Sequence, residues 1–261
     1  MNEIPPLNAA ALLKRYDLHA RKGLGQNFLQ DPLALEKIIS AAEIQHTDSV
    51  LEIGPGLGSL TRYLAVAAKD VVAVELDPGL LPPLKAVLAP YSNVRVIHGD
   101  ILKTSPKDFM LEGNYIVVAN IPYYITSAVI RHLLESETQP RRIVLTVQKE
   151  VAQRICEEPG DMSLLALSVQ VYGKPRIAAR IPADAFFPAG MEPIEGVVDY
   201  STGAFLGVRS ADALLRVYGR DRWGWPVGVA HHLFADDVDA PASERAWGDW
   251  VAGVFENERV A

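Results

Sequence analysis

The chain has 261 residues, 49% of them hydrophobic, and a formal net charge of −7 at pH 7. This length is enough for one large domain, or for a core of about 180 residues with a small appendage. The sequence contains no apolar run near the roughly 18 residues that span a bilayer. The first residues lack the basic-then-apolar order of a signal peptide, and the single cysteine, Cys156, excludes a multi-cysteine metal cluster. We therefore expect a cytoplasmic, metal-free monomer that has no membrane partner.

The negative charge is concentrated toward the C-terminal end. Residues 1–190 hold 19 Lys and Arg against 20 Asp and Glu, whereas residues 191–261 hold 6 against 12. The second segment contains no lysine but carries all four tryptophans. Because the composition changes near Gly190, we expect one domain over residues 1–188 and a small, divergent and poorly folded C-terminal region over residues 189–261.

Apolar strands alternate with helical patterns along the first domain. An Asp-Pro pair followed by apolar residues at helical spacing predicts a capped helix over residues 31–44. Short β-rich runs predict strands, each followed by a helical pattern or a turn, at residues 49–53, 71–76, 94–98, 115–119 and 142–148. The helices among them are expected at 61–68, at 127–136 and at 150–156, and a proline-interrupted helix is expected to end at about residue 88. Residues 163–171 and 176–181 form either the last strands or a helix–strand pair. The alternation predicts an α/β fold with a mostly parallel, seven-stranded sheet covered on both faces.

A glycine-rich loop follows the first of these strands. It reads Glu52-Ile-Gly54-Pro-Gly56-Leu-Gly58, so the glycines have the spacing G-x-G-x-G. Dinucleotide folds prefer G-x-G-x-x-G with a pyrophosphate at the helix N-terminus. An acid two residues before the first glycine would repel a pyrophosphate but suits the cationic methionine end of S-adenosylmethionine. The alternative is a tight strand–helix turn without a ligand.

Two further acids stand at predicted strand ends, where ligands of parallel sheets bind. Glu75 closes the second strand and is suited to accept hydrogen bonds from both ribose hydroxyls, with Leu76 beside it. Asp100 follows the third strand and is suited to accept from the adenine amino group of the cofactor, with Ile101 against the ring. Each acid alone has a simpler explanation, a solvated strand-end acid for Glu75 and an N-cap for Asp100. Their order along the chain favours a cofactor site.

The sequence Asn120-Ile121-Pro122-Tyr123 follows the fourth strand. An adenine amino group is a poor nucleophile because its lone pair is delocalised into the ring. Acceptors on its two protons, the Asn120 side-chain oxygen and the Ile121 carbonyl, would draw the nitrogen toward a tetrahedral geometry. Pro122 makes the loop rigid, and Tyr123 offers a face on which a flipped-out base stacks. The loop therefore predicts methylation of a planar amino group, and an Asn-x-Pro turn without chemistry is the alternative.

Three segments together resemble one known family. They are the sequence RKGLGQNFL from Arg21 to Leu29, the loop EIGPGLG, and NIPYYITS from Asn120. They are similar to the KsgA-type ribosomal RNA adenine dimethyltransferases, and the Erm methyltransferases share much of the pattern. The similarity continues through VQKEVAQRI, which favours the KsgA branch, to about Pro188.

The resemblance implies a Rossmann-like class I methyltransferase fold and S-adenosyl-L-methionine as cofactor. It implies that Gln26, Asn27 and Leu29 contact the cofactor. It also implies dimethylation of adenine N6 on two adjacent adenosines near the 3′ end of 16S rRNA. The partner would then be the immature 30S subunit during ribosome biogenesis.

The resemblance becomes weaker at Phe186-Phe187-Pro188, which matches the start of the family's F-x-P-x-P-K-V segment. It implies that Phe186 sandwiches the target base, although a buried core Phe is an alternative. The family's basic C-terminal domain is not recognisable after that point. Arg21 and Lys22 are the basic residues that we expect to contact RNA.

Three other functions stay open. A methyltransferase of the Erm type would act on 23S rRNA, and a DNA adenine or protein glutamine methyltransferase would use a similar Asn-x-Pro-Tyr loop. A protein of the same fold that binds RNA and assists ribosome assembly without catalysis is the third; Asn120 and Glu75 argue against it, and the unusual C-terminal region keeps it open.

Overall fold

The computed structural model describes residues 4–110, 114–122, 125–158, 162–170, 172–188 and 196–201. Within these ranges the side chains of Lys22, Leu164 and residues 196–201 are not described. The predictions made for Tyr123 and for residues 202–261 lie outside these ranges.

A seven-stranded sheet forms the centre of the protein, in the order β4-β3-β2-β5-β6-β9-β7. The first five strands in this order each pair in parallel with their neighbours, from β4 to β6. The strand β9 pairs antiparallel with both β6 and β7. The strands are β2 (Ser49–Ile53), β3 (Asp70–Glu75), β4 (Val94–His98), β5 (Ile116–Asn120), β6 (Arg142–Val147), β7 (Lys174–Ala179) and β9 (Gly196–Ser201). The expected α/β fold with a mostly parallel sheet is confirmed.

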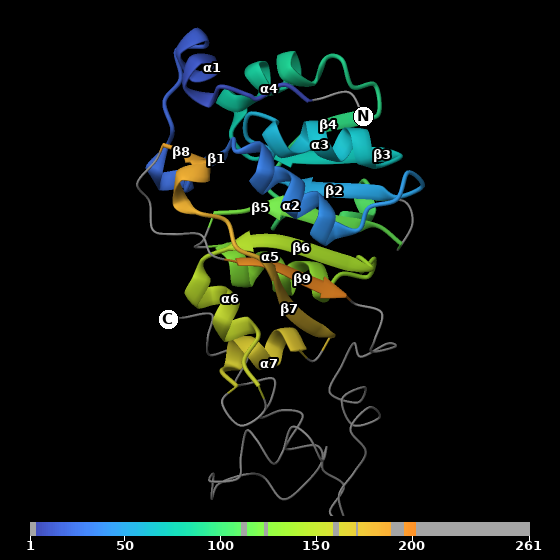
Figure 1. Ribbon diagram of the computed structural model, residues 1–261. Coiled ribbons are helices and arrows are strands. Elements are labelled where there is room, and N and C mark those ends of the chain that lie inside the picture. The colour runs from blue at the N-terminus through green and yellow to red at the C-terminus, as the bar shows by residue number, and fades with distance from the viewer. Residues whose placement is uncertain are drawn as a thin grey trace, which may run out of the picture.

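Helices cover both faces of this sheet (Figure 1). One face of the sheet is covered by α2 (Pro32–Ala42) and α3 (Ser59–Ala67). The other face is covered by α5 (Thr126–Leu134), α6 (Lys149–Ile155) and α7 (Leu164–Gln170). The remaining helices are α1 (Ala9–Arg15) and α4 (Leu81–Leu88), with short 3-10 turns at Lys22–Leu24, Pro78–Leu80, Pro106–Asp108 and Ala183–Ala185.

The alternation of side chains along β5 explains the two-sided core. Successive residues of a strand point to opposite faces of the sheet. Ile116 and Val118 accordingly pack in the core with α2 and α3, and Val117 and Ala119 pack in the core with α5. All four are buried and apolar, which is the pattern of a central strand of a parallel sheet. Asn120 is an even number of residues from Ile116 and Val118, so its side chain leaves the same face of the sheet as theirs.

The start of α2 is fixed by local sequence. Asp31 is the N-cap, and its Oδ1 accepts a hydrogen bond from Ala34 N at 2.7 Å, with proline at the first helical position. The helix ends at Ala42, and the C-cap residue Glu43 adopts a left-handed conformation with φ 48°. The Asp-Pro signal therefore predicts this start correctly.

Other predicted boundaries differ slightly from the observed ones. The second strand begins one residue earlier and ends at Glu75, and Asn120 is the last residue of β5 instead of the first residue after it. For residues 163–171 and 176–181 the sequence allows either two strands or a helix–strand pair. The structure has the helix–strand pair, α7 and β7. The sequence patterns predict neither α1 nor β9.

The strand β9 lies beyond residue 188, at which we expect the first domain to end. It stands between β6 and β7, so the sheet includes residues from both sides of that boundary (Figure 1). The division of the chain at residue 188 stays a prediction, but the central sheet does not end there.

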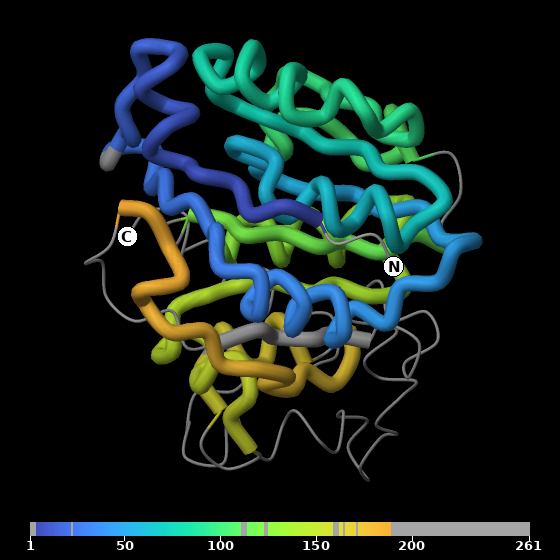
Figure 2. The backbone as a smooth tube through the Cα atoms, turned by 45° about the horizontal axis from the view of Figure 1, so that its top comes forward, coloured from blue at the N-terminus to red at the C-terminus, as the bar shows by residue number. Residues whose placement is uncertain are grey.

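A small strand pair joins two segments that are far apart in sequence. β1 (Phe28–Leu29) pairs antiparallel with β8 (Phe186–Phe187), with Phe28 opposite Phe187 and Leu29 opposite Phe186. Figure 2 shows the two segments side by side, outside the main sheet. The pairing holds the residues just before β1 at the edge where the parallel strands end.

Candidate active site

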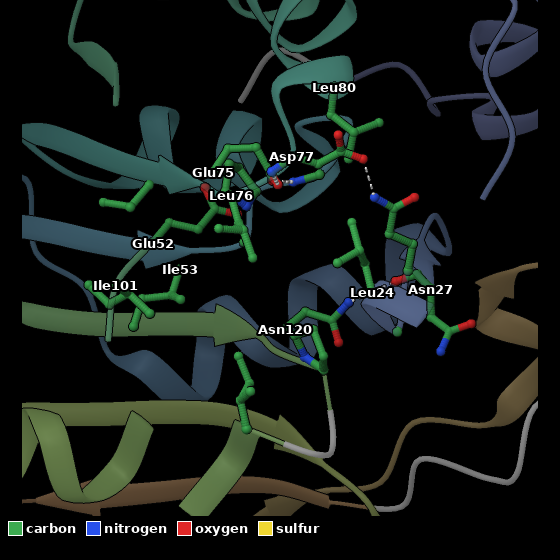
Figure 3. Close-up of a pocket in the computed structure, with 18 of the residues that line it drawn as sticks. Leu24, Asn27, Glu52, Ile53, Glu75, Leu76, Asp77, Leu80, Ile101 and Asn120 are labelled. Atoms are coloured by element: carbon green, nitrogen blue, oxygen red, sulfur yellow. Dashed lines mark hydrogen bonds between the residues drawn. The ribbon is translucent and has the colours of Figure 1, made fainter. Parts of the chain in front are cut away.

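A cavity of about 280 Å³ opens at the carboxyl ends of the parallel strands. Its walls come from the ends of β2, β3, β4 and β5 and from the loop before β1 (Figure 3). Residues far apart in sequence meet here because parallel strands end at one edge. Twelve of the predicted site residues line it: Gln26, Asn27, Leu29, Glu52, Gly54, Gly56, Glu75, Leu76, Asp100, Ile101, Asn120 and Pro122.

The glycine turn after β2 brings backbone close to this cavity. Gly56 has φ +59°, and a Cβ on it would lie 3.2 Å from two ring carbons of Phe28. The position therefore needs glycine both for its conformation and for space. Gly58 does not line the cavity; a Cβ there would lie 3.1 Å from Leu84 Cδ1, so its small size serves the packing of α3 against α4.

Glu75, the last residue of β3, stabilises the glycine turn that follows β2. Its Oε2 accepts a hydrogen bond from Gly56 N at 3.0 Å, and its Oε1 accepts from Asp77 N at 2.8 Å. Burial raises the pKa of the Glu75 carboxyl above its ordinary value, while these two backbone donors act in the opposite direction. A carboxylate has about four lone-pair positions, so Glu75 keeps acceptor capacity on the cavity side.

Glu52 lies at the floor of the cavity and is only 1% exposed. Its Oε2 has no hydrogen-bond partner among the described residues. Burial raises the pKa of the Glu52 carboxyl to about 8, and the neighbouring Glu75 carboxylate adds to the rise. A buried acid of this kind favours a cation beside it, because a positive charge offsets the cost of burying the carboxylate.

Apolar and acidic groups from β3 and β4 form the opposite wall. Ile101 is buried, whereas Leu76 lines the cavity and is 48% exposed. Asp100 Oδ1 accepts a hydrogen bond from Leu102 N at 3.1 Å, and Lys103 Nζ lies 3.6 Å from Asp100 Oδ2. The Leu102 contact is the local turn expected of an Asp after a strand, and it leaves Asp100 at the cavity.

The loop before β1 is tied to the end of β3 through Asp77. Gln26 Nε2 donates to Asp77 Oδ2 at 2.7 Å, and Gln26 Oε1 accepts from Arg21 N at 2.9 Å. Both polar ends of the Gln26 side chain are therefore used within the protein. Arg21 Nη1 lies 3.1 Å from Asp77 Oδ1. Asp77 is a residue that sequence reasoning missed, although the Asp-Pro pair after β3 is a turn signal.

Asn27 connects this loop to β5. Its carbonyl oxygen accepts a hydrogen bond from Asn120 Nδ2 at 3.0 Å. Its own side-chain Oδ1 is buried and has no partner among the described residues. Since an unpaired buried acceptor is costly, this atom is suited to a donor from a molecule in the cavity.

The Asn120 turn has three described residues. Asn120 and Pro122 line the cavity, as Figure 3 shows for Asn120, while the Ile121 side chain is buried in the core on the α5 face. Thr146 Oγ1 on β6 lies 2.5 Å from Asn120 Oδ1. Tyr123, expected to stack on the base, lies outside the described residues.

Phe186 is placed differently from its expected role. The side chain is 3% exposed, belongs to the core formed with α2 and α3, and does not line the cavity. Its pairing with Leu29 in the β1–β8 pair explains this position. Packing is therefore the role that the structure gives Phe186, and the sandwiching of a base stays a prediction.

The basic residues expected to contact RNA are only partly described. The Arg21 side chain is 58% exposed and pairs with Asp77, so it contributes to the loop as well as to the surface. The side chain of Lys22 is not described.

Among the residues that the structure describes, His, Cys, Asp and Glu form no group that could hold a metal ion. In the same part of the chain, every helix is too short or too polar to cross a bilayer.

The fold and the cavity at its strand ends define a class I methyltransferase of Rossmann-like architecture. Within this class, the sequence model of the family described as ribosomal RNA adenine dimethylase matches residues 18–192. The chain belongs to this family. The match includes the loop before β1, the glycine turn and the Asn120 turn.

Curated relatives agree with this assignment. The ribosomal RNA small subunit methyltransferase A of Dehalococcoides mccartyi is 49% identical over 187 residues, which cover 70% of this chain and 64% of the relative. The protein of the same description from Ligilactobacillus salivarius is 43% identical over 198 residues, covering 72% of this chain and 67% of the relative. The chain thus spans less than two thirds of the length of the Dehalococcoides relative.

Solved structures show the same architecture. A dimethyladenosine transferase from Plasmodium falciparum is 32% identical, with a TM-score of 0.60 over 67% of this chain and 62% of that chain. The 23S rRNA methyltransferase ErmE is 29% identical, with a TM-score of 0.63 over 73% of this chain and 75% of that chain. Both branches named by the sequence resemblance are therefore represented among similar proteins.

Proposed function

We propose that the cavity binds S-adenosyl-L-methionine and that the chain dimethylates adenine N6 on two adjacent adenosines near the 3′ end of 16S rRNA. The observation that carries this proposal is the position of Asn120. It ends β5 and lines the same cavity as the glycine turn and Glu75. An amide suited to an amino-purine therefore stands beside a pocket suited to a methyl donor.

The residues of the cavity fit this cofactor. The unpaired Asn27 Oδ1 and the buried Glu52 are acceptors for its cationic methionine end. Glu75 would accept from the ribose hydroxyls, and Asp100 from the adenine amino group. Leu76 and Ile101 supply the apolar surfaces for the ring, which explains why Leu76 remains half exposed in this wall. When bound, the cofactor supplies an electrophilic methyl group on a cationic sulfur.

The Asn120 turn would hold the base. Asn120 Oδ1 and the Ile121 carbonyl would accept hydrogen bonds from the two N–H groups of the amine, so the nitrogen lone pair is less delocalised into the ring. Pro122 keeps the turn rigid, and Tyr123 supplies the stacking face that the sequence predicts. The amino nitrogen, held in this way, would be positioned to take the methyl group that the bound cofactor supplies, and it would release a proton to solvent. Catalysis then depends on positioning.

The substrate class follows from the family and its relatives. The two curated relatives described above are named as small-subunit methyltransferases, which supports 16S rRNA in an immature 30S particle as partner. We place the protein in the cytoplasm, where ribosomes assemble, and propose that it acts as a monomer. Arg21 and Lys22 would contribute contacts to the RNA backbone.

The test is transfer of tritiated methyl groups to 30S particles isolated from cells that lack the modification. We expect label in 16S rRNA with the wild-type chain and at least a hundredfold less with Asn120→Ala, since one positioned group contributes about that factor. Absence of label despite tight cofactor binding would instead favour a non-catalytic assembly factor.

A second candidate is methylation of 23S rRNA. The similarity to ErmE, with its TM-score of 0.63 over most of both chains, is the observation that favours it. The same assay on 50S particles and free 23S rRNA separates the two, because label would then appear in 23S rRNA and not in 16S rRNA. Transfer to an adenine-containing DNA duplex tests the remaining alternative.

A further inference from the structure

Thr146 and Asn120 are neighbours on two parallel strands. They are directly registered partners in the β5–β6 pairing, so their side chains leave the same face of the sheet. This is the face covered by α2 and α3, because Val118 and Val144, two residues earlier on each strand, pack in that core. Thr146 is 1% exposed. A buried hydroxyl therefore lies against the amide at the cavity.

The hydrogen bonds of Asn120 fix which end of its amide faces Thr146. Its Nδ2 lies 3.0 Å from the carbonyl oxygen of Asn27, a group that only accepts hydrogen bonds. The nitrogen must therefore point to Asn27 and the oxygen to Thr146. Thr146 Oγ1 lies 2.5 Å from Asn120 Oδ1 but 3.5 Å from the carbonyl of Ala119, so the hydroxyl donates to the side chain of Asn120.

We propose that Thr146 is a positioning residue that holds the Asn120 side-chain oxygen in place to receive the amino group of the target base. The inference rests on the methyl transfer proposed above. An amide oxygen has two lone pairs, so the Thr146 hydroxyl occupies one and leaves the other for the base. Together with Asn27, Thr146 fixes both ends of a side chain that otherwise turns about two bonds.

This arrangement differs from ordinary packing of a β-branched residue in a strand. Valine has nearly the shape of threonine and would fill the same space, but it cannot donate a hydrogen bond. If only packing matters at this position, valine should serve as well as threonine. If the hydroxyl matters, serine should serve better than valine, although it packs less well.

The experiment compares Thr146→Val, Thr146→Ser and the wild type in methyl transfer to 30S particles. We expect Thr146→Val to lower kcat about tenfold, the effect of losing one hydrogen bond, with the Kd for S-adenosylmethionine within twofold of wild type. Thr146→Ser should stay within about threefold in kcat. Ser168→Ala, which removes a hydroxyl that bonds to Leu165 O on α7, should leave kcat unchanged. An unchanged kcat in Thr146→Val, or an equal loss in Thr146→Ser, overturns the proposal.

A second readout does not depend on turnover. The side-chain amide of Asn120 gives its own ¹⁵N–¹H resonances, and we expect Thr146→Val to shift and broaden them while Thr146→Ser keeps them sharp. Unchanged resonances in Thr146→Val overturn the proposal. If the wild type methylates no substrate, the proposed function fails, and these resonances still decide whether Thr146 holds Asn120. If Thr146→Val does not fold, Thr146→Ala is measured by the same criteria.

Discussion

Asp77 and Gln26 are joined by a hydrogen bond of 2.7 Å between Asp77 Oδ2 and Gln26 Nε2. The bond links the end of β3 to the loop that carries Asn27, and Arg21 adds an ion pair to the other carboxylate oxygen. The Asp77 carboxylate is nearly buried, so its hydrogen bond to Gln26 is little screened by water, whereas the Arg21 side chain is 58% exposed. Asp77 therefore closes one side of the cavity by holding a loop of the N-terminal segment against the sheet.

Asp77→Ala should weaken cofactor binding about tenfold, because a hydrogen bond to a charged group contributes about 1.5–3 kcal/mol. Isothermal titration calorimetry with S-adenosylmethionine measures the change. Lys107→Ala is the control: it removes an exposed ion pair with Glu137 at 2.8 Å, which should contribute little. Wild-type affinity in Asp77→Ala would mean that the loop stays in place without this contact.

Gly56→Ala should destabilise the protein by about 1–3 kcal/mol and weaken cofactor binding. The residue has φ +59°, and the new Cβ would lie 3.2 Å from the ring of Phe28. Gly23→Ala is the matched control, since no atom lies within 4 Å of a Cβ built there. Urea unfolding gives the free energy of each variant. Equal stability of the two variants would contradict the steric argument.

Glu52 should make the stability of the cofactor-free protein depend on pH. Burial raises its pKa in the folded protein to about 8, above the ordinary value of 4.5. Between these two values the folded state binds more protons than the unfolded state, so the free energy of unfolding falls as pH rises from 4.5 through 8. One group contributes at most about 1.4 kcal/mol per pH unit. Glu52→Gln should remove this part of the slope in unfolding measurements from pH 5 to 8.5, and an unchanged slope would assign it to other groups.

Cofactor binding should oppose this protonation. A cationic methionine end beside Glu52 favours the carboxylate, so binding at pH 7 should release protons. Titrations in buffers of different ionisation enthalpy count the protons, and we expect up to one per site in the wild type and fewer in Glu52→Gln. Equal release in both proteins would place the proton elsewhere.

Shortened chains test the role of β9. A chain that ends at Ser201 keeps every strand described here, whereas a chain that ends at Pro188 leaves β6 and β7 without the strand between them. We expect the first to unfold cooperatively and to bind S-adenosylmethionine with an affinity near that of the full chain. The second should lose several degrees in Tm or fail to fold. Equal behaviour of the two chains would show that β9 adds nothing to the sheet.

Much of the fold and of the site is predictable because it depends on local sequence and on the ends of strands. Glu75, Asp100 and Asn120 are recognisable from their positions after apolar runs, and the topology of parallel strands is sufficient to bring them together. The glycine turn carries its own conformational signal. Three predicted strands have at least one end at the observed residue.

The features that the sequence does not reveal depend on contacts between distant segments. The Thr146–Asn120 bond requires the register of β5 and β6, and the burial of Phe186 requires its pairing with Leu29. β9 lies in a segment whose composition differs from the rest, and an antiparallel strand inserted between β6 and β7 follows no local pattern. The pairing of distant strands therefore determines these features, which the periodicity of apolar residues in the sequence does not predict.

The most direct test of the account is mass spectrometry of nucleosides from 16S rRNA after undermethylated 30S particles are incubated with the protein and S-adenosylmethionine. We expect N6,N6-dimethyladenosine at two adjacent positions near the 3′ end, and none with Asn120→Ala. Methylation confined to 23S rRNA or DNA, or an Asn120→Ala variant as active as the wild type, would contradict it.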